Sequence, residues 1–185
     1  MRRFAPFFFA AALAVPAVAH ADDPPATNDA AKTTTTTSAV SQADKDFVAE
    51  AAQGGLSEVK LGQLAQSKAQ SESVKSFANK MITDHTKAND ELKVVAQKKG
   101  LTVPTDVSSE QQKTYDDLAK LSGAEFDKAY MDTMVKDHDE DVAVFQKQAK
   151  SGKDKDIKNF AHKVLPTLEN HKKMAHANAS GTKKM

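Results

Sequence analysis

The chain has 185 residues, of which 28% are charged, and its formal net charge is +1 at neutral pH. This length fits one ordinary domain with tails, and the near-neutral balance disfavours a strongly basic nucleic-acid binder. The sequence contains no cysteine, which excludes disulfides, a thiolate nucleophile, and iron–sulfur or thiolate zinc sites.

Residues 1–21 have the pattern of a secretory signal peptide. Two arginines follow the initial methionine, an apolar stretch covers residues 4–15, and residues 19–21 read Ala-His-Ala. The apolar stretch is shorter than the roughly 20 residues that span a bilayer, so a cleaved signal is favoured over a retained anchor. We therefore expect export to the periplasm or cell envelope, with no transmembrane span in the mature chain.

Residues 22–41 contain two prolines and a run of threonines, with little apolar surface. Segments of this composition cannot bury enough apolar area to fold, so we expect a disordered linker. Residues 178–185 are expected to form a flexible tail for the same reason. The folded domain is therefore predicted over residues 42–177.

Within residues 42–177 the apolar positions recur at alternating intervals of three and four, which predicts long helices packed side by side. The first two helices are expected over 43–67 and 72–99, with Ser41 and Ser71 as caps, and Gly100 ends the second. A short helix over 109–121 should open with a capping box formed by Ser108 and Gln111.

Two more long helices are expected, the first opened by a capping box at Ser122 and Glu125 and closed by Gly152. The second should run over 155–177, with Asp154 as its cap. The short turns within each pair predict antiparallel hairpins. Together the elements predict an all-α, antiparallel four-helix bundle, with the short extra helix in the connection between the second and third long helices.

Each long helix places one potential metal ligand on its core-facing line. These residues are Glu58, His85, His138 and His171. Burying such groups without partners costs free energy, so they should meet one another or water. Three imidazoles and one carboxylate would suit Zn(II), Cu(II) or Fe, and the sequence therefore predicts a metal site at the centre of the bundle.

Two observations leave open alternatives to a single metal site formed by all four residues. Counting along the helices from the turns leaves height mismatches of about 5 to 8 Å, so the four residues need not form one site. They could also form a hydrogen-bonded polar layer that fixes helix register, or lie partly in solvent. Asp84, Asp137 and Glu169 are expected off the core-facing line, as partners of the ligands at most.

A ferritin-type di-iron centre is disfavoured, because such centres use Glu-x-x-His twice and this spacing does not occur in the sequence. Gly54 and Gly55 within the first helix indicate close packing against a neighbouring helix, or a local bulge. We found no nucleophile motif and no phosphate-binding loop.

Four phrases resemble the bacterial exported family called domain of unknown function 4142. They are DKDFVAEAAQGGLSEVKLGQLA, VKSFANKMITDHTKANDEL, FDKAYMDTMVKDH and IKNFAHKVLPTLENH. The resemblance covers about residues 42–176 and implies a ferritin-like four-helix bundle and an envelope location. The family pattern matches here at Glu58, at the Asp84-His85 and Asp137-His138 pairs, and at His171. The resemblance implies no established activity and no catalytic residue.

Three functions follow as hypotheses. The first is a non-enzymatic, metal-binding or stress-related envelope protein, which binds Zn, Cu or Fe through the four core-facing ligands. The second is an oxidoreductase with an atypical His/Glu metal centre. The third is a purely structural or interaction module, in which apolar residues could replace the four groups without loss of stability. A metal ion is the one partner that the sequence suggests.

Overall fold

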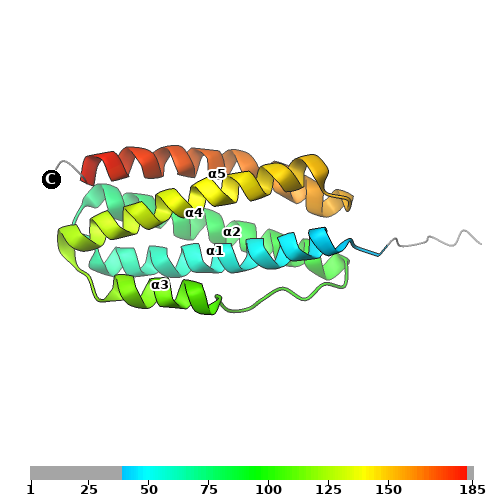
Figure 1. Ribbon diagram of the computed structural model, residues 1–185, viewed down its shortest axis with the longest axis horizontal. Helices are drawn as coiled ribbons and strands as arrows, with labels where there is room; N and C mark the ends of the chain where they lie inside the picture. The colour runs from blue at the N-terminus through cyan, green and yellow to red at the C-terminus, as the bar shows by residue number, and fades with distance from the viewer. Residues whose placement is uncertain (1–38, 183–185) are drawn as a thin grey trace, which may run out of the picture. The chain divides into compact units, whose positions relative to one another are not determined.

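A computed structural model describes residues 39–182 as five helices, and no strand occurs in this range (Figure 1). The helices are α1 Gln42–Lys68, α2 Glu72–Lys98, α3 Ser109–Ala119, α4 Gly123–Ser151 and α5 Lys155–Thr182. The predicted all-α bundle with an extra short helix is confirmed. The predicted signal peptide, most of the predicted linker, and residues 183–185 lie outside the described residues.

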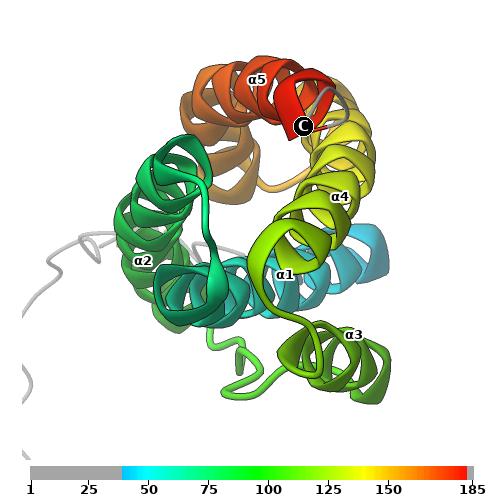
Figure 2. The same cartoon turned by 90° about the vertical axis from the view of Figure 1, so that its left-hand side faces the viewer.

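The four long helices surround a common centre in the order α1, α2, α5, α4, and α3 lies outside this ring against α1 and α4 (Figure 2). The colours of Figure 1 show that α1 and α5 run in one direction and α2 and α4 in the other. Neighbouring helices in the ring are therefore antiparallel, and α1 is diagonal to α5. One long connection, which carries α3, joins α2 to α4, as in ferritin-like bundles.

Most predicted helix ends are confirmed by their hydrogen bonds. The Ser41 hydroxyl accepts from the Asp44 amide, Ser108 and Gln111 form the capping box, and Asp154 accepts from the amides of Asp156 and Ile157. Ser71 precedes α2 as predicted, but its side chain makes no capping bond. The capping box predicted at Ser122 is wrong for the same reason. The chain instead enters α4 through Gly123 at φ +59°, a left-handed conformation that glycine adopts without strain.

Two buried aspartates lock the turns of the opposite hairpins. Asp44 of α1 accepts hydrogen bonds from the Gln148 side chain and from the backbone amides of Lys153 and Asp154, in the α4–α5 turn. Asp127 of α4 accepts from the backbone amides at residues 70 and 71, in the α1–α2 turn. Each hairpin therefore holds the other at one end of the bundle.

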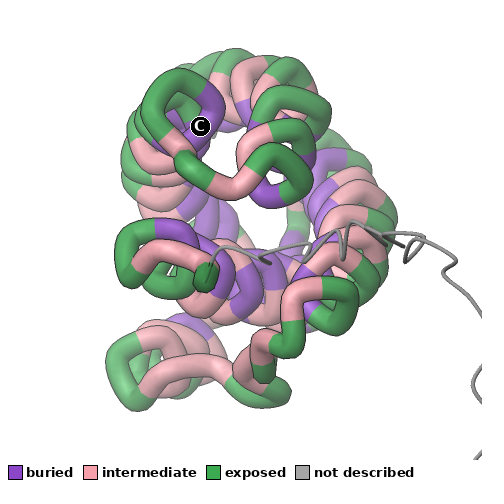
Figure 3. The backbone as a smooth tube through the Cα atoms, turned by 90° about the vertical axis from the view of Figure 1, so that its right-hand side faces the viewer, coloured by how far each residue is buried: buried purple, intermediate pink, exposed green. Residues whose placement is uncertain are grey.

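The apolar core is divided into two clusters along the bundle. The Phe126 cluster lies at the end with the α1–α2 turn, and the Phe145 cluster lies at the end with the α4–α5 turn. The Phe126 cluster includes Phe77, Met81, Phe126, Tyr130, Met131 and Met134, and the Phe145 cluster includes Phe47, Leu92, Val142, Phe145, Phe160 and Leu168. Figure 3 shows that buried residues line the inner sides of the helices.

The end of α5 differs from the prediction, whereas the close packing predicted at the glycine pair is found at Gly55. Helix α5 runs to Thr182, so residues 178–182 are helical where a flexible tail was predicted, because Ala179 is buried in the Phe126 cluster and the Asn178 side chain donates to the Met174 carbonyl. Gly55 lies against α2, where a Cβ atom would clash with the Asn89 side chain; this close approach accounts for the glycine. No helix within residues 39–182 combines the length and hydropathy needed to cross a bilayer.

Candidate metal centre

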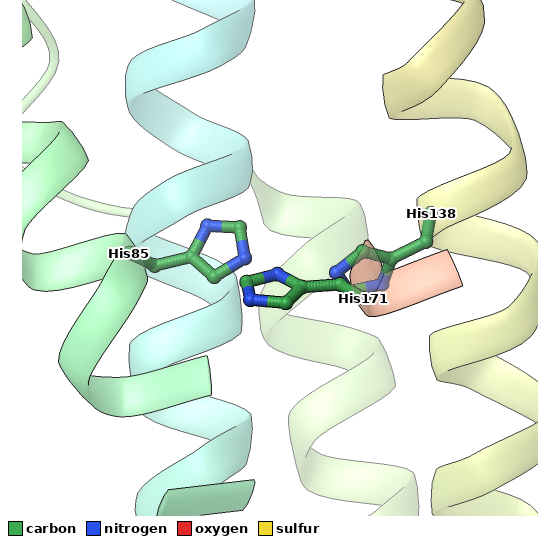
Figure 4. Close-up of side chains that lie close together, drawn as sticks. All are labelled: His85, His138 and His171. Carbon is green, nitrogen blue, oxygen red and sulfur yellow. The ribbon is translucent and has the colours of Figure 1, made fainter. Parts of the chain in front are cut away.

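Three histidines from three helices meet between the two apolar clusters. His85 of α2, His138 of α4 and His171 of α5 are all buried, and one nitrogen from each ring lies within 4.8 Å of the other two (Figure 4). Their ring centroids are 5.3 to 5.7 Å apart. The order of the helices around the bundle explains why the three histidines lie together, because α5 lies between α2 and α4.

Two of these rings are oriented by a hydrogen bond at one nitrogen. Nε2 of His171 lies 2.8 Å from the Asp84 carboxylate, and Nδ1 of His138 lies 3.0 Å from the Met134 carbonyl oxygen. A carbonyl oxygen only accepts, so Nδ1 of His138 carries the hydrogen; the carboxylate fixes the hydrogen of His171 on Nε2 in the same way. The remaining nitrogen of each neutral ring then presents a lone pair, as in metal sites with outer hydrogen-bond partners.

Each histidine has one buried nitrogen without a hydrogen-bond partner among the described residues. These atoms are Nε2 of His85, Nε2 of His138 and Nδ1 of His171. A buried polar atom without a partner costs on the order of 1–3 kcal/mol, and three such atoms at one place are unusual in a native protein. A cation held among them would satisfy all three.

The electrostatics keep the three imidazoles neutral. Burial lowers the pKa of His85 well below its usual value, and the charges of His138 and His171 lower it further. Burial also lowers the pKa of His138, and burial with the charge of His138 lowers the pKa of His171 to about 4. The rings are therefore unprotonated at neutral pH, which is the form that binds metal ions.

Asp84 is ionised beside the centre. Burial alone would raise its pKa, but hydrogen bonds from Lys80 and His171 outweigh burial and lower it below the usual value. An ionised carboxylate on the far nitrogen of a metal-binding imidazole increases the basicity of the ring. The expectation that Asp84 could only be a partner of a ligand agrees with this geometry.

Glu58 is buried in the same layer but does not belong to the group of three. Its Oε1 lies 3.7 Å from Nδ1 of His138, the nitrogen already bound to the Met134 carbonyl, and its Oε2 has no hydrogen-bond partner. Burial and the charge of Asp137 raise the pKa of Glu58 well above its usual value, which favours the neutral acid. The structure thus brings together three of the four predicted ligands and leaves the fourth outside their group.

Glu58 also lines an acidic pocket of about 290 Å³ between α1, α3 and α4. The pocket contains six carboxyl groups, which are Glu50, Glu58, Glu110, Asp137, Glu140 and Asp141. Burial, followed by the charge of Glu58, raises the pKa of Asp141 to about 7, and burial raises that of Asp137 to about 6. The sequence analysis did not identify Asp141 as a candidate site residue. Its spacing of three from His138 could have revealed it, because residues three apart lie next to each other on the surface of one helix.

Tyr130 was missed as well. Its side chain is fully buried, its hydroxyl has no hydrogen-bond partner, and its ring stacks on Phe126. Burial and the nearby charges of Glu58 and Asp137 raise the pKa of its hydroxyl well above the usual value. The intervals of four between Tyr130, Met134 and His138 could have revealed it, since they place all three residues on one helix face.

The three nitrogens need little movement to bind an ion. Three atoms within 4.8 Å of one another have a common centre at most about 2.8 Å from each, whereas imidazole–zinc bonds measure about 2.0–2.1 Å. Each ring would have to move inward by less than about 1 Å, which side-chain rotation on fixed helices can supply. The geometry is therefore that of a preformed three-nitrogen site.

The family described as a domain of unknown function (DUF4142) matches residues 29–177. The chain belongs to the DUF4142 family. A solved structure, the crystal structure of a DUF305 fragment from Deinococcus radiodurans, is similar to this DUF4142 chain with a TM-score of 0.67. The identity is 13% over 76% of this chain and 97% of that chain, which supports the shared helical fold alone. No curated protein matches the DUF4142 chain.

Proposed function

We propose that this DUF4142 protein binds one transition metal ion at the centre of its bundle, through His85, His138 and His171. The observation that carries the proposal is that each ring has a buried nitrogen without a partner, while one nitrogen from each ring lies within 4.8 Å of the others. Asp84 and the Met134 carbonyl support two of the three ligands from outside.

The donor set favours Zn²⁺ or Cu²⁺ over the other ions considered. Imidazole nitrogen suits zinc, copper and iron, but non-haem iron sites usually add a carboxylate to two histidines. Glu58 does not join the group of three, and its raised pKa favours an acid that has to lose a proton before it can bind a metal ion. We therefore expect a nitrogen-bound Zn²⁺ or Cu²⁺ ion.

A hydrogen-bonded polar layer is the competing explanation for buried histidines in this position. Such a layer stabilises a core when its members satisfy one another, and a partly satisfied network is costly. Within residues 39–182, the three rings make no hydrogen bond to each other, and each keeps one buried nitrogen without a partner. This pattern supports a ligand site over a register-fixing layer.

We also propose that the protein is exported to the periplasm or envelope. The proposal rests on the basic, apolar and Ala-His-Ala features of residues 1–21. Fractionation of cells that express the full chain, with mass spectrometry of the purified product, tests it. Cleavage after Ala21 and recovery from the periplasmic fraction are expected, and an intact cytoplasmic chain would contradict export.

Metal binding is tested on protein purified without an affinity tag. Elemental analysis and titration calorimetry should give one Zn²⁺ or Cu²⁺ ion per chain, and the His171→Ala variant should lose this binding. The matched control is His176→Ala, since His176 lies on the same helix but is exposed and pairs with Asp139 on the surface. Equal binding by wild type and His171→Ala would overturn the proposal.

A further inference from the structure

We propose that the metal ion at the three-histidine centre keeps one open coordination position, which a small inorganic anion reaches through a pocket between α2 and α5. The inference rests on the proposed metal site and adds to it the class of ligand that the ion would exchange. Three features of the structure support it: the pocket, the number of protein ligands, and the charges on the two sides of the centre.

The pocket between α2 and α5 leads directly to the centre. Its walls include His85 and His171. They also include the apolar residues Ala88, Val164 and Leu168 and the polar residue Thr167. Its volume is about 120 Å³. A cavity needs about 10–15 Å³ of this kind of volume to hold one water molecule, so the pocket has room for several waters or for an ion of a few atoms.

The described residues bring three imidazole nitrogens together at the centre. No other His, Asp or Glu side chain within residues 39–182 joins the group of three nitrogens. Two carboxyl groups lie beside nitrogens that are already hydrogen-bonded, since Asp84 binds Nε2 of His171 and Glu58 lies beside Nδ1 of His138. Zinc sites with three protein ligands hold an exchangeable ligand in the fourth position.

The charges around the centre favour an anion as the exchangeable ligand, and they favour its entry through the α2–α5 pocket. A divalent ion among three neutral imidazoles leaves two uncompensated positive charges at a buried point, which attract an anion strongly. The side-chain charges on the walls of the α2–α5 pocket cancel, because two lysines, Lys87 and Lys163, stand against two carboxyl groups, Asp84 and Glu91. The acidic pocket on the side of Glu58 has one lysine and six carboxyl groups; Glu58 favours the neutral acid, and the remaining excess of carboxyl groups would repel an anion.

Azide and the Co²⁺-loaded protein test the proposal. The visible spectrum of Co²⁺ reports the atoms bound to it, and elemental analysis of the same sample gives the metal content. Added azide should change the spectrum in a saturable way without releasing Co²⁺. Stoichiometric Co²⁺ with an azide-independent spectrum would overturn the open position while leaving the metal site intact. Failure to bind Co²⁺ or Zn²⁺ would overturn both.

The route is tested by filling one pocket or the other. Thr167→Leu narrows the α2–α5 pocket and should weaken azide binding by at least about tenfold at unchanged Co²⁺ content. The matched control is Thr114→Leu, which makes the same change at a partly buried threonine of the acidic pocket and should leave azide binding unchanged. A larger loss in Thr114→Leu than in Thr167→Leu would contradict the route.

Glu58 provides a further check. If this carboxyl group filled the fourth position in the loaded protein, azide would change the spectrum only after Glu58→Gln opened the site. We expect azide to act on wild type and on Glu58→Gln alike, because the Glu58 carboxyl lies beside the nitrogen of His138 that is bound to Met134. A response restricted to Glu58→Gln would overturn the inference.

Discussion

The ends of the bundle and its middle layer differ in how well their buried groups are satisfied. At the two ends, aromatic and aliphatic side chains pack against one another, and Asp44 and Asp127 are fully used in locking the turns. In the middle, four buried polar atoms lack hydrogen-bond partners within residues 39–182, and they belong to Glu58, His85, His138 and His171, while a fifth, the Tyr130 hydroxyl, lies in the Phe126 cluster. The ends therefore provide the stability of the fold, and the unpartnered polar atoms of the middle layer reduce it.

The largest expected effect is at the apolar ends. Phe77 is 1% exposed and packs on Tyr130 in the Phe126 cluster, so Phe77→Ala should lower the free energy of unfolding by about 3–5 kcal/mol. Urea denaturation measures this loss. The control is Val94→Ala, at a residue that is 50% exposed, with an expected change within about 0.5 kcal/mol. Similar losses in the two variants would show that the ends do not carry the stability.

The turn-locking aspartates should give the next largest effect, and it should depend on pH. Burial raises the pKa of Asp44, but hydrogen bonds from Gln148, Ser41 and two backbone amides outweigh burial and lower it. A depressed carboxyl pKa gives stability above the unfolded value near 4 that is lost as the pH falls through the folded pKa. Asp44→Ala should cost about 1.5–3 kcal/mol at pH 7 and flatten this acid limb in pH-dependent denaturation.

A change of opposite sign is expected in the middle layer. The His85 ring makes no hydrogen bond within the described structure, so His85→Leu removes a buried unsatisfied group and should raise the stability of the metal-free protein by about 1–3 kcal/mol. The same variant should lose the rise in melting temperature that Zn²⁺ gives to wild type. Destabilisation of the metal-free protein by several kcal/mol would mean that the layer is structural.

The acidic pocket should give a dependence of stability on pH that is opposite in sign to that of Asp44. The pKa of Asp141 is raised to about 7 by burial and by the charge of Glu58, and Asp137 and Glu50 add to the repulsion while His138 opposes it. The native state then binds a proton that the unfolded state has lost, so stability falls as the pH rises from about 4 to 7. Asp141→Asn should reduce this slope, to which the raised pKa values of Glu58 and Asp137 also contribute, and should stabilise the protein at pH 8. An unchanged slope would place its origin elsewhere.

The sequence predicted the fold well because helical spacing repeats over each long segment. The apolar intervals of three and four predicted the long helices, and they placed Glu58, His85, His138 and His171 on the core-facing lines between apolar residues, although their relative heights along the bundle stayed open. The end of α5 was misjudged because the polar residues that follow Ala177 hide the one packed residue, Ala179.

The composition of the site was less predictable, because the order of the helices around the bundle is not encoded in the spacing within each helix. In that order α5 lies between α2 and α4, which brings three histidines together, and α1 is diagonal to α5, which leaves Glu58 at the side of His138. The tautomers of His138 and His171 depend on Asp84 and on a backbone carbonyl, which only the packed structure reveals.

The most direct test of the account is nitrogen NMR of the imidazole rings during a Zn²⁺ titration. In the metal-free protein, His138 should carry its hydrogen on Nδ1 and His171 on Nε2, two different tautomers in one site. One equivalent of Zn²⁺ should shift Nε2 of His85, Nε2 of His138 and Nδ1 of His171, and leave the exposed His162 and His176 unchanged. Shifts confined to the exposed histidines, or none at all, would contradict the metal centre.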